Sequence, residues 1–143
     1  MNILFLSQNQ FKSIFNVDKG VDNSGTIVIS IVTSDSDCYV ISNSFLDSIQ
    51  LVFEDNEQSF TSSLANSIID FINKHKNSQC SQIIVHCLMG ISRSAAVALF
   101  LEEYINYAVI DDIQRSPYRN YNRFVYSTLI NTLGFIPNEK SSS

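Results

Sequence analysis

The sequence predicts an α/β fold in which helices flank a central, mostly parallel sheet of about four to five strands. The first observation is the β-branched run Thr26–Val32, which is typical of a strand buried on both faces. The second is an amphipathic helical pattern over residues 57–75, which lies between two shorter apolar runs. A strand, a helix and a strand in that order favour a parallel α/β unit.

Short apolar segments define the strands, and periodic apolar residues define the first long helix. The predicted strands cover residues 3–6, Thr26–Val32, 49–53 and 83–85. The residues that recur at helical spacing within 57–75 are Phe60, Leu64, Ile68, Phe71 and Ile72. The helix therefore presents one apolar stripe to the predicted sheet.

Two more helices are predicted in the second half of the chain. The segment 94–107 is apolar nearly all round, which is typical of a central, buried helix. The last helix covers about 122–133, with Asn122 well suited as its N-cap and Gly134 as its C-terminal stop. We interpret the apolar stripe of this last helix as core packing.

The length of 143 residues leaves room for one domain with a proper core, which we assign to residues 1–137. The Ser-rich end, residues 138–143, is predicted to be disordered. Hydrophobic residues make up 45% and charged residues 16% of the chain, which is an ordinary globular composition. No apolar run reaches membrane-spanning length, and residues 1–6 are too short and uncharged for a signal peptide. We therefore expect a cytoplasmic protein.

Cysteine content and charge limit the kinds of partner. Cys38, Cys80 and Cys87 are an odd number without framework spacing, so reduced thiols are expected. A redox pairing of Cys38 or Cys80 with an oxidised Cys87 stays an open alternative. The net charge of −5 argues against nucleic-acid and anionic-membrane binding, because both need many Lys and Arg contacts to phosphate. Any phosphate that the protein binds must be held locally.

A phosphate-binding loop is predicted between the strand 83–85 and the helix 94–107. The sequence here is His-Cys-Leu-Met-Gly-Ile-Ser-Arg-Ser, from His86 to Ser94. The five residues between Cys87 and Arg93 are Leu88, Met89, Gly90, Ile91 and Ser92. Such a loop curls around a tetrahedral anion with its N–H groups pointing inward, and Gly90 permits backbone angles that a Cβ would obstruct.

The same loop supplies a nucleophile and a clamp for the anion. The positive end of the following helix and the charge of Arg93 favour the thiolate form of Cys87. Arg93 can grip two phosphate oxygens with a bidentate fork, which Lys could not do equally well. A buried structural cysteine is the alternative interpretation of Cys87, but it does not explain these neighbours.

These nine residues resemble the His-Cys-x5-Arg signature of the protein tyrosine phosphatase superfamily, in the Gly-x-Ser-Arg-Ser form common in dual-specificity and related small phosphatases. The resemblance implies a phosphocysteine intermediate on Cys87, phosphate binding by the loop from Leu88 to Arg93, and phosphorylated proteins or peptides as substrates. It also implies that Ser94 helps the thiolate leave and that His86 supports the loop. No metal or cofactor is expected, because the phosphocysteine route needs neither.

A general acid is also required, and in this family it is an Asp on a mobile loop before the cysteine. Asp55 is the natural candidate, because it follows the predicted strand 49–53 in a polar stretch that could act as a lid. Glu54, Glu57 and Asp47 are nearby alternatives. Favourable charge at a helix N-terminus is another interpretation of Asp55 itself.

Two further functions remain open from the residues. A pseudophosphatase that only captures phosphorylated partners needs just the loop and Arg93, so a working general acid is what separates it from an enzyme. A sulfur-transfer or arsenate-reducing enzyme could use Cys87, but it does not explain the Arg93-Ser94 pair.

Side chains around the loop give a first indication of the substrate. Leu88, Met89 and Ile91 are apolar, which favours protein or simple aryl phosphates over a highly charged lipid headgroup. The arginines at 115, 119 and 123 recur every four residues, and could recruit acidic phosphopeptides or form a solvated face.

Overall fold

The computed structural model describes residues 2–16, 22–106 and 116–134, and the predicted tail 138–143 lies outside these ranges. The strands are β1 (Asn2–Ser7), β2 (Thr26–Val32), β3 (Asp47–Val52) and β4 (Gln82–Cys87). The longer helices are α2 (Ser62–Lys74), α3 (Arg93–Asn106) and α5 (Arg123–Leu133). Shorter helical turns are α1 (Gln8–Gln10), its continuation Phe11–Phe15, Asp35–Asp37 and Ser116–Tyr118.

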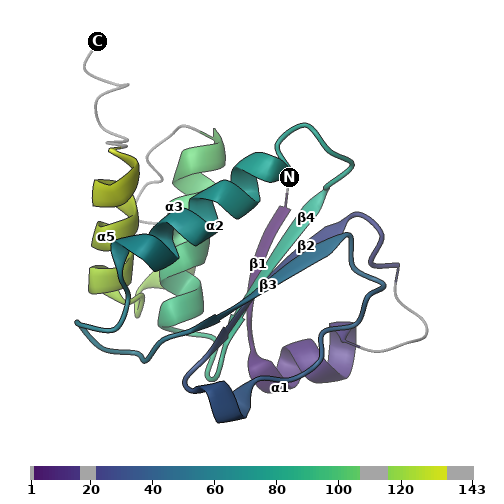
Figure 1. Cartoon of the computed structure of the whole chain (residues 1–143), viewed down its shortest axis with the longest axis horizontal. Coiled ribbons are helices and arrows are strands. Elements are labelled where there is room, and N and C mark those ends of the chain that lie inside the picture. The colour runs from purple at the N-terminus through teal and green to yellow at the C-terminus, as the bar shows by residue number, and fades with distance from the viewer. Residues whose placement is uncertain (1, 17–21, 107–115, 135–143) are drawn as a thin grey trace.

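The four strands form one sheet in the order β1-β4-β2-β3, and every neighbouring pair is parallel. Helices α2, α3 and α5 lie over one face, while α1 and its continuation lie on the other (Figure 1). The predicted α/β class with a parallel sheet is therefore confirmed.

The central position of β2 in the sheet explains why its sequence shows no alternation of polar and apolar residues. All seven of its residues are buried. Ile27, Ile29 and Ile31 pack in the larger core beneath the helix layer, whereas Val28 packs in a second core with Phe11. A strand covered on both faces has no solvent side to mark with polar residues.

Helices α3 and α5 agree closely with the sequence-based expectations, whereas α2 begins at Ser62 and not at residue 57, because the Thr61 hydroxyl caps the helix there. In α3 every residue from Ala95 to Leu101 is fully buried, so the apolar pattern all round the helix reflects a central position. Asn122 caps α5 by accepting a hydrogen bond from the Val125 N–H at 3.0 Å, and Gly134 ends the helix with φ of +71°. The predicted cap and stop are both confirmed.

The α1 region was not predicted. It begins at a capping box in which the Ser7 hydroxyl accepts from the Gln10 N–H, and it places the buried ring of Phe11 against the sheet. A helix of this length carries too few turns to show an apolar period, and only one of its side chains is fully buried.

Because the strands are all parallel, their carboxyl ends meet at one edge of the sheet, which is where α/β proteins bind their ligands. Cys87 ends β4 at this edge, Thr33 follows β2, and Phe53 follows β3. None of the helices within the described ranges is long and apolar enough to cross a membrane.

Candidate active site

The Cys87 thiol lies at the centre of the loop that joins β4 to α3. The residue is only 2% exposed. Its Sγ is 3.1 Å from the Ser94 hydroxyl and accepts a hydrogen bond from the Gly90 N–H at 3.3 Å. The loop therefore turns a backbone donor toward the thiol, as expected for a loop that curls around an anion.

Gly90 is required for two separate reasons. Its φ of +75° is a conformation that residues with a side chain rarely adopt. A Cβ at this position would also lie 2.3 Å from the Ser7 nitrogen and 2.5 Å from the Leu6 carbonyl carbon. The first reason was predictable from the motif, but the second arises because the loop packs directly on the end of β1.

Arg93 is the first residue of α3, and its guanidinium is fixed by the ends of two strands. It is 5% exposed. Nη1 donates to the Phe53 carbonyl at 2.7 Å and to the Thr33 hydroxyl at 3.2 Å. Nε is buried and has no hydrogen-bond partner among the described residues. A buried donor of this kind favours an anionic ligand, since an unpaired buried N–H is unfavourable.

Asp55 is held at the rim of this loop. Its Oδ1 accepts from the Ser92 hydroxyl at 2.8 Å and from the Asn122 side-chain amide at 2.7 Å. Among the residues that the structure describes, Oδ2 has no hydrogen-bond partner. The carboxyl is thus anchored by one oxygen and presents the other, which is the arrangement that a proton donor needs.

Asn122 does more than the sequence indicated. While its Oδ1 caps α5, its Nδ2 donates to Asp55 and to the Asn56 carbonyl at 3.2 Å. Its backbone N–H donates to the Ser92 carbonyl at 3.1 Å. One residue thus links the loop, the acidic segment and α5, and no local sequence signal could have shown a contact across 67 residues.

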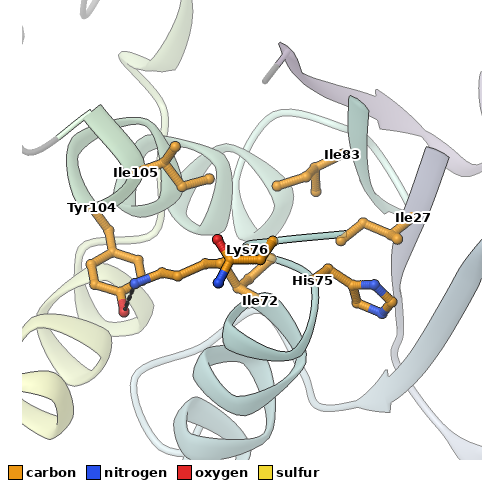
Figure 2. Close-up of a pocket in the computed structure, with 8 residues that line it drawn as sticks. Ile27, Ile72, His75, Lys76, Ile83, Tyr104 and Ile105 are labelled. Atoms are coloured by element: carbon orange, nitrogen blue, oxygen red, sulfur yellow. Dashed lines mark hydrogen bonds between the residues drawn. The ribbon is translucent and has the colours of Figure 1, made fainter. Parts of the chain in front are cut away.

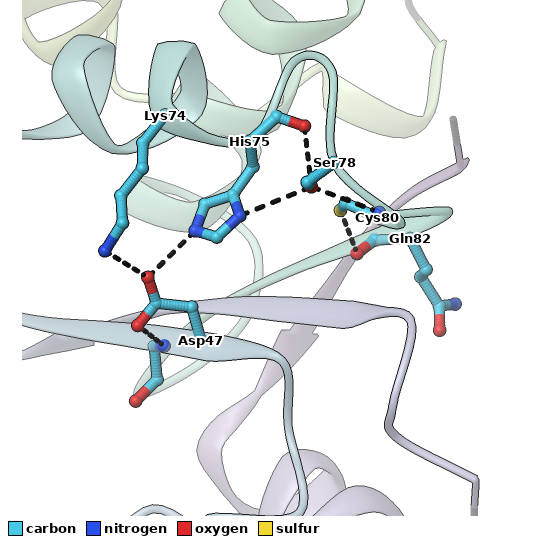
Figure 3. Close-up of polar contacts among 7 residues, drawn as sticks. Asp47, Lys74, His75, Ser78, Cys80 and Gln82 are labelled. Carbon is cyan, nitrogen blue, oxygen red and sulfur yellow. Dashed lines mark hydrogen bonds and ion pairs between the residues drawn. The ribbon is translucent and has the colours of Figure 1, made fainter.

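The alternative acids lie in different places. Asp47 begins β3 at the opposite edge of the sheet, where its Oδ2 bonds to Lys74 at 3.0 Å and to His75 at 2.8 Å (Figure 3). Glu54 and Glu57 are exposed, and Glu57 borders a hollow of about 280 Å³ that Asp55 also lines. Asp47 is therefore removed from the thiol, whereas the two glutamates stay near Asp55.

His86 is buried behind the loop in an aromatic setting. The Phe11 ring stacks on it at 4.7 Å, and the Tyr39 hydroxyl is 2.6 Å from Nε2. Burial lowers the pKa of His86 to about 4 and raises that of Tyr39 to about 12. The hydrogen bond between the Tyr39 hydroxyl and Nε2 therefore joins two neutral groups, and the tautomer of His86 sets which of them donates. The supporting role of His86 stays a prediction, and the sequence around Tyr39 gave no sign of the contact between these two side chains.

The pKa of His86 predicts acid sensitivity of the fold. The unfolded chain binds a proton at His86 below about pH 6.5, whereas the folded chain does so only near pH 4. The free energy of unfolding should therefore fall by about 3 kcal/mol between pH 7 and pH 4 through this residue alone. Urea unfolding across this range should show a shallower pH slope in His86→Gln than in the original protein. Equal slopes in the two proteins would contradict the assignment.

A larger cavity, of about 360 Å³, lies at the other edge of the sheet (Figure 2). Ile27, Ile72 and Ile83 line it, and Lys76 donates a hydrogen bond to the Tyr104 hydroxyl at its rim. Ile27 and Ile83 lie near the first residues of their strands, so this cavity is separate from the Cys87 loop.

The redox alternative is not favoured by the positions of the thiols. Cys80 precedes β4 and donates to the Gln82 carbonyl, so the whole of that strand separates it from Cys87. Cys38 is exposed, and all three thiols are free.

The catalytic-domain model of the dual specificity phosphatases matches residues 1–111 of the chain. The chain belongs to this family. The match includes the sheet, the loop and α3, and the dual specificity phosphatase assignment agrees with the resemblance seen in the His86 to Ser94 motif. A search of curated proteins found no match.

Solved structures with the same fold include three phosphatase-related proteins. The human tyrosine phosphatase-like serine/threonine/tyrosine-interacting protein is 20% identical, with a TM-score of 0.55 and coverage of 76% of each chain. OH1 from the Orf virus, described as a tyrosine phosphatase with triple substrate specificity, is 15% identical, with a TM-score of 0.56 and coverage of 91% of this chain and 81% of its own. Tk-PTP, in a G95A mutant form, is 10% identical, with a TM-score of 0.56 and coverage of 99% of this chain and 93% of its own. Because all three sequences are less than 25% identical to this chain, the similarity shows only that the fold is shared.

Proposed function

We propose that this protein hydrolyses phosphotyrosine monoesters in proteins through a phosphocysteine intermediate, and that phosphoserine and phosphothreonine are further candidate substrates. The observation that carries the proposal is the meeting of three groups around one loop. They are the buried Cys87 thiol, the Arg93 guanidinium, whose Nε has no hydrogen-bond partner in the described part of the chain, and the anchored Asp55 carboxyl. Together they supply a nucleophile, an anion clamp and a proton donor.

In the first step, the Cys87 thiolate attacks phosphorus and the bond to the tyrosine oxygen breaks. Asp55 gives its proton to that departing oxygen, so the phenol leaves neutral. The loop amides and Arg93 stabilise the charge on the phosphoryl oxygens during transfer.

In the second step, water attacks the phosphocysteine and the S–P bond breaks. The Asp55 carboxylate takes the proton from water, and inorganic phosphate is released. The Ser94 hydroxyl, 3.1 Å from Sγ, donates a hydrogen bond to the departing thiolate. At the end of the cycle Cys87 is again a thiolate and Asp55 is again protonated.

The second candidate is a module that binds phosphorylated partners without turnover. The loop and Arg93 are sufficient for that role. The double anchoring of Asp55 by Ser92 and Asn122 favours the enzyme, because a binder has no need of a carboxyl beside a phosphate. We infer a cytoplasmic setting for either role, since free thiols persist in reducing compartments.

The direct test is release of phosphate from p-nitrophenyl phosphate and from a phosphotyrosine peptide, with and without a metal chelator. We expect turnover of both substrates at the same rate in the two conditions, because the phosphocysteine route uses no metal. Saturable peptide binding without phosphate release would favour the binding module instead.

Arg93→Lys should weaken binding of tungstate or vanadate and lower kcat/KM by about 10²–10³, the usual effect of losing an oriented transition-state donor. Lysine keeps the charge but cannot donate to Phe53 and Thr33 while also holding two phosphate oxygens. Arg123→Lys, at an exposed position on α5, is the matched control and should retain activity. Unchanged oxyanion affinity in Arg93→Lys would contradict the clamp role.

A further inference from the structure

Two acidic loops border the candidate site. The segments 33–40 and 53–60 begin at the two groups that Arg93 contacts, the Thr33 hydroxyl and the Phe53 carbonyl. They carry five exposed carboxylates and no lysine or arginine: Asp35, Asp37, Glu54, Asp55 and Glu57. Lys12 lies over the Tyr39 ring at 4.1 Å and offsets part of this charge, so this side of the site is negative in net charge.

An apolar lip borders the same site. Leu88 is 55% exposed, Met89 is 68% exposed and Ile91 is 51% exposed. These side chains belong to the loop that surrounds the Cys87 thiol, and they make up half of the large hydrophobic residues exposed in the described ranges. Apolar side chains gathered at the mouth of a site indicate a contact surface.

Inside the site, Arg93 offers a buried donor for an anion. Among the described residues, the Nε of Arg93 has no hydrogen-bond partner, and Arg93 is only 5% exposed. Arg123, an exposed cation, lines the neighbouring hollow and lies over the Tyr121 ring at 4.9 Å. A second phosphate or an acidic side chain would therefore approach carboxylates on the side of the two loops.

We propose that the protein selects phosphotyrosine segments whose neighbouring residues are basic or apolar, and that it discriminates against acidic and multiply phosphorylated substrates. This proposal rests on the proposed function. The basic neighbours face the two acidic loops, and the apolar neighbours contact the lip. Recruitment of acidic phosphopeptides by the arginines at 115, 119 and 123 is not favoured by this charge distribution, and Arg115 lies outside the described residues.

The test compares phosphotyrosine peptides that differ only in the residues flanking the tyrosine: Lys, Leu, Ser or Glu. We expect kcat/KM to be about ten-fold higher for Lys flanks than for Glu flanks at low salt, and the difference to shrink as salt is added. Leu flanks should be preferred over Ser flanks, and that preference should persist in salt. A phosphoinositide in a vesicle serves as the polyanionic substrate in the same experiment, and we expect it to be hydrolysed most slowly.

Asp35→Lys isolates the charge effect, because Asp35 is exposed and lies outside the proposed catalytic machinery. It should reduce the preference for Lys over Glu flanks by about three-fold or more while leaving turnover of p-nitrophenyl phosphate unchanged. Asp70→Lys makes the same charge change on α2, toward its far end, and should leave the preference intact.

Equal rates on the Lys and Glu peptides, or faster turnover of the phosphoinositide, would overturn the specificity proposal while leaving the proposed hydrolysis standing. An equal effect of Asp35→Lys and Asp70→Lys would also overturn it, since only net charge would then matter. Absence of turnover on every substrate, including p-nitrophenyl phosphate, would instead contradict the proposed function itself.

Discussion

Replacing Cys87 with serine is expected to lower turnover by about 10⁴-fold or more, because a serine hydroxyl stays protonated near neutral pH and is a poor nucleophile without a base. Tungstate binding should be largely intact, because the Gly90 N–H and the Arg93 guanidinium remain in place. Calorimetry of tungstate binding and single-turnover phosphate release measure the two effects separately.

Cys80→Ser is the matched control, since this thiol lies at the other end of β4. It should keep normal turnover. If Cys87→Ser retained more than a small fraction of activity, Cys87 would not be the nucleophile. If it lost tungstate binding as well, the loop would depend on the thiol for its conformation, and loss of activity would say nothing about the chemistry.

Asp55→Asn is expected to reduce kcat by about 10²–10⁴, the usual contribution of a general acid. Asparagine preserves the shape of the side chain and an oxygen that can accept from Ser92 and Asn122, so the geometry of the rim should persist. Substrate affinity should change little. The loss should be large for a phosphotyrosine peptide and small for an activated aryl phosphate, because such a phenolate departs without a proton.

The pH dependence of the rate is a second test of the Asp55→Asn variant. The basic limb of the rate profile should flatten in Asp55→Asn, because that limb reports loss of the acid's proton. Glu54→Gln, Glu57→Gln and Asp47→Asn are controls for removal of charge. If one of these showed the dependence on leaving group and Asp55→Asn did not, the acid would be misassigned. If none showed it, the binding module would become the better explanation.

The sequence was sufficient for the parallel sheet, because buried parallel strands and amphipathic helices leave a local apolar pattern. It also located α5 to within a residue, since Asn122 and Gly134 act on the backbone of their own neighbours. It failed for α1, which is too short to show a period. It also started α2 too early, because Phe60 fits the apolar period although Thr61 caps the helix after it. Both errors come from short segments where local signals are ambiguous.

The loop from His86 to Ser94 could be predicted from the sequence alone, because its spacing, its glycine and its flanking elements are contiguous in the chain. The groups that surround this loop could be identified only from the folded structure. Thr33 and Phe53 reach Arg93, Asn122 reaches Asp55, and Tyr39 reaches His86, each across dozens of residues. Those contacts exist because parallel strands bring their carboxyl ends to one edge, and a pairing between distant segments leaves no period or motif in either segment alone.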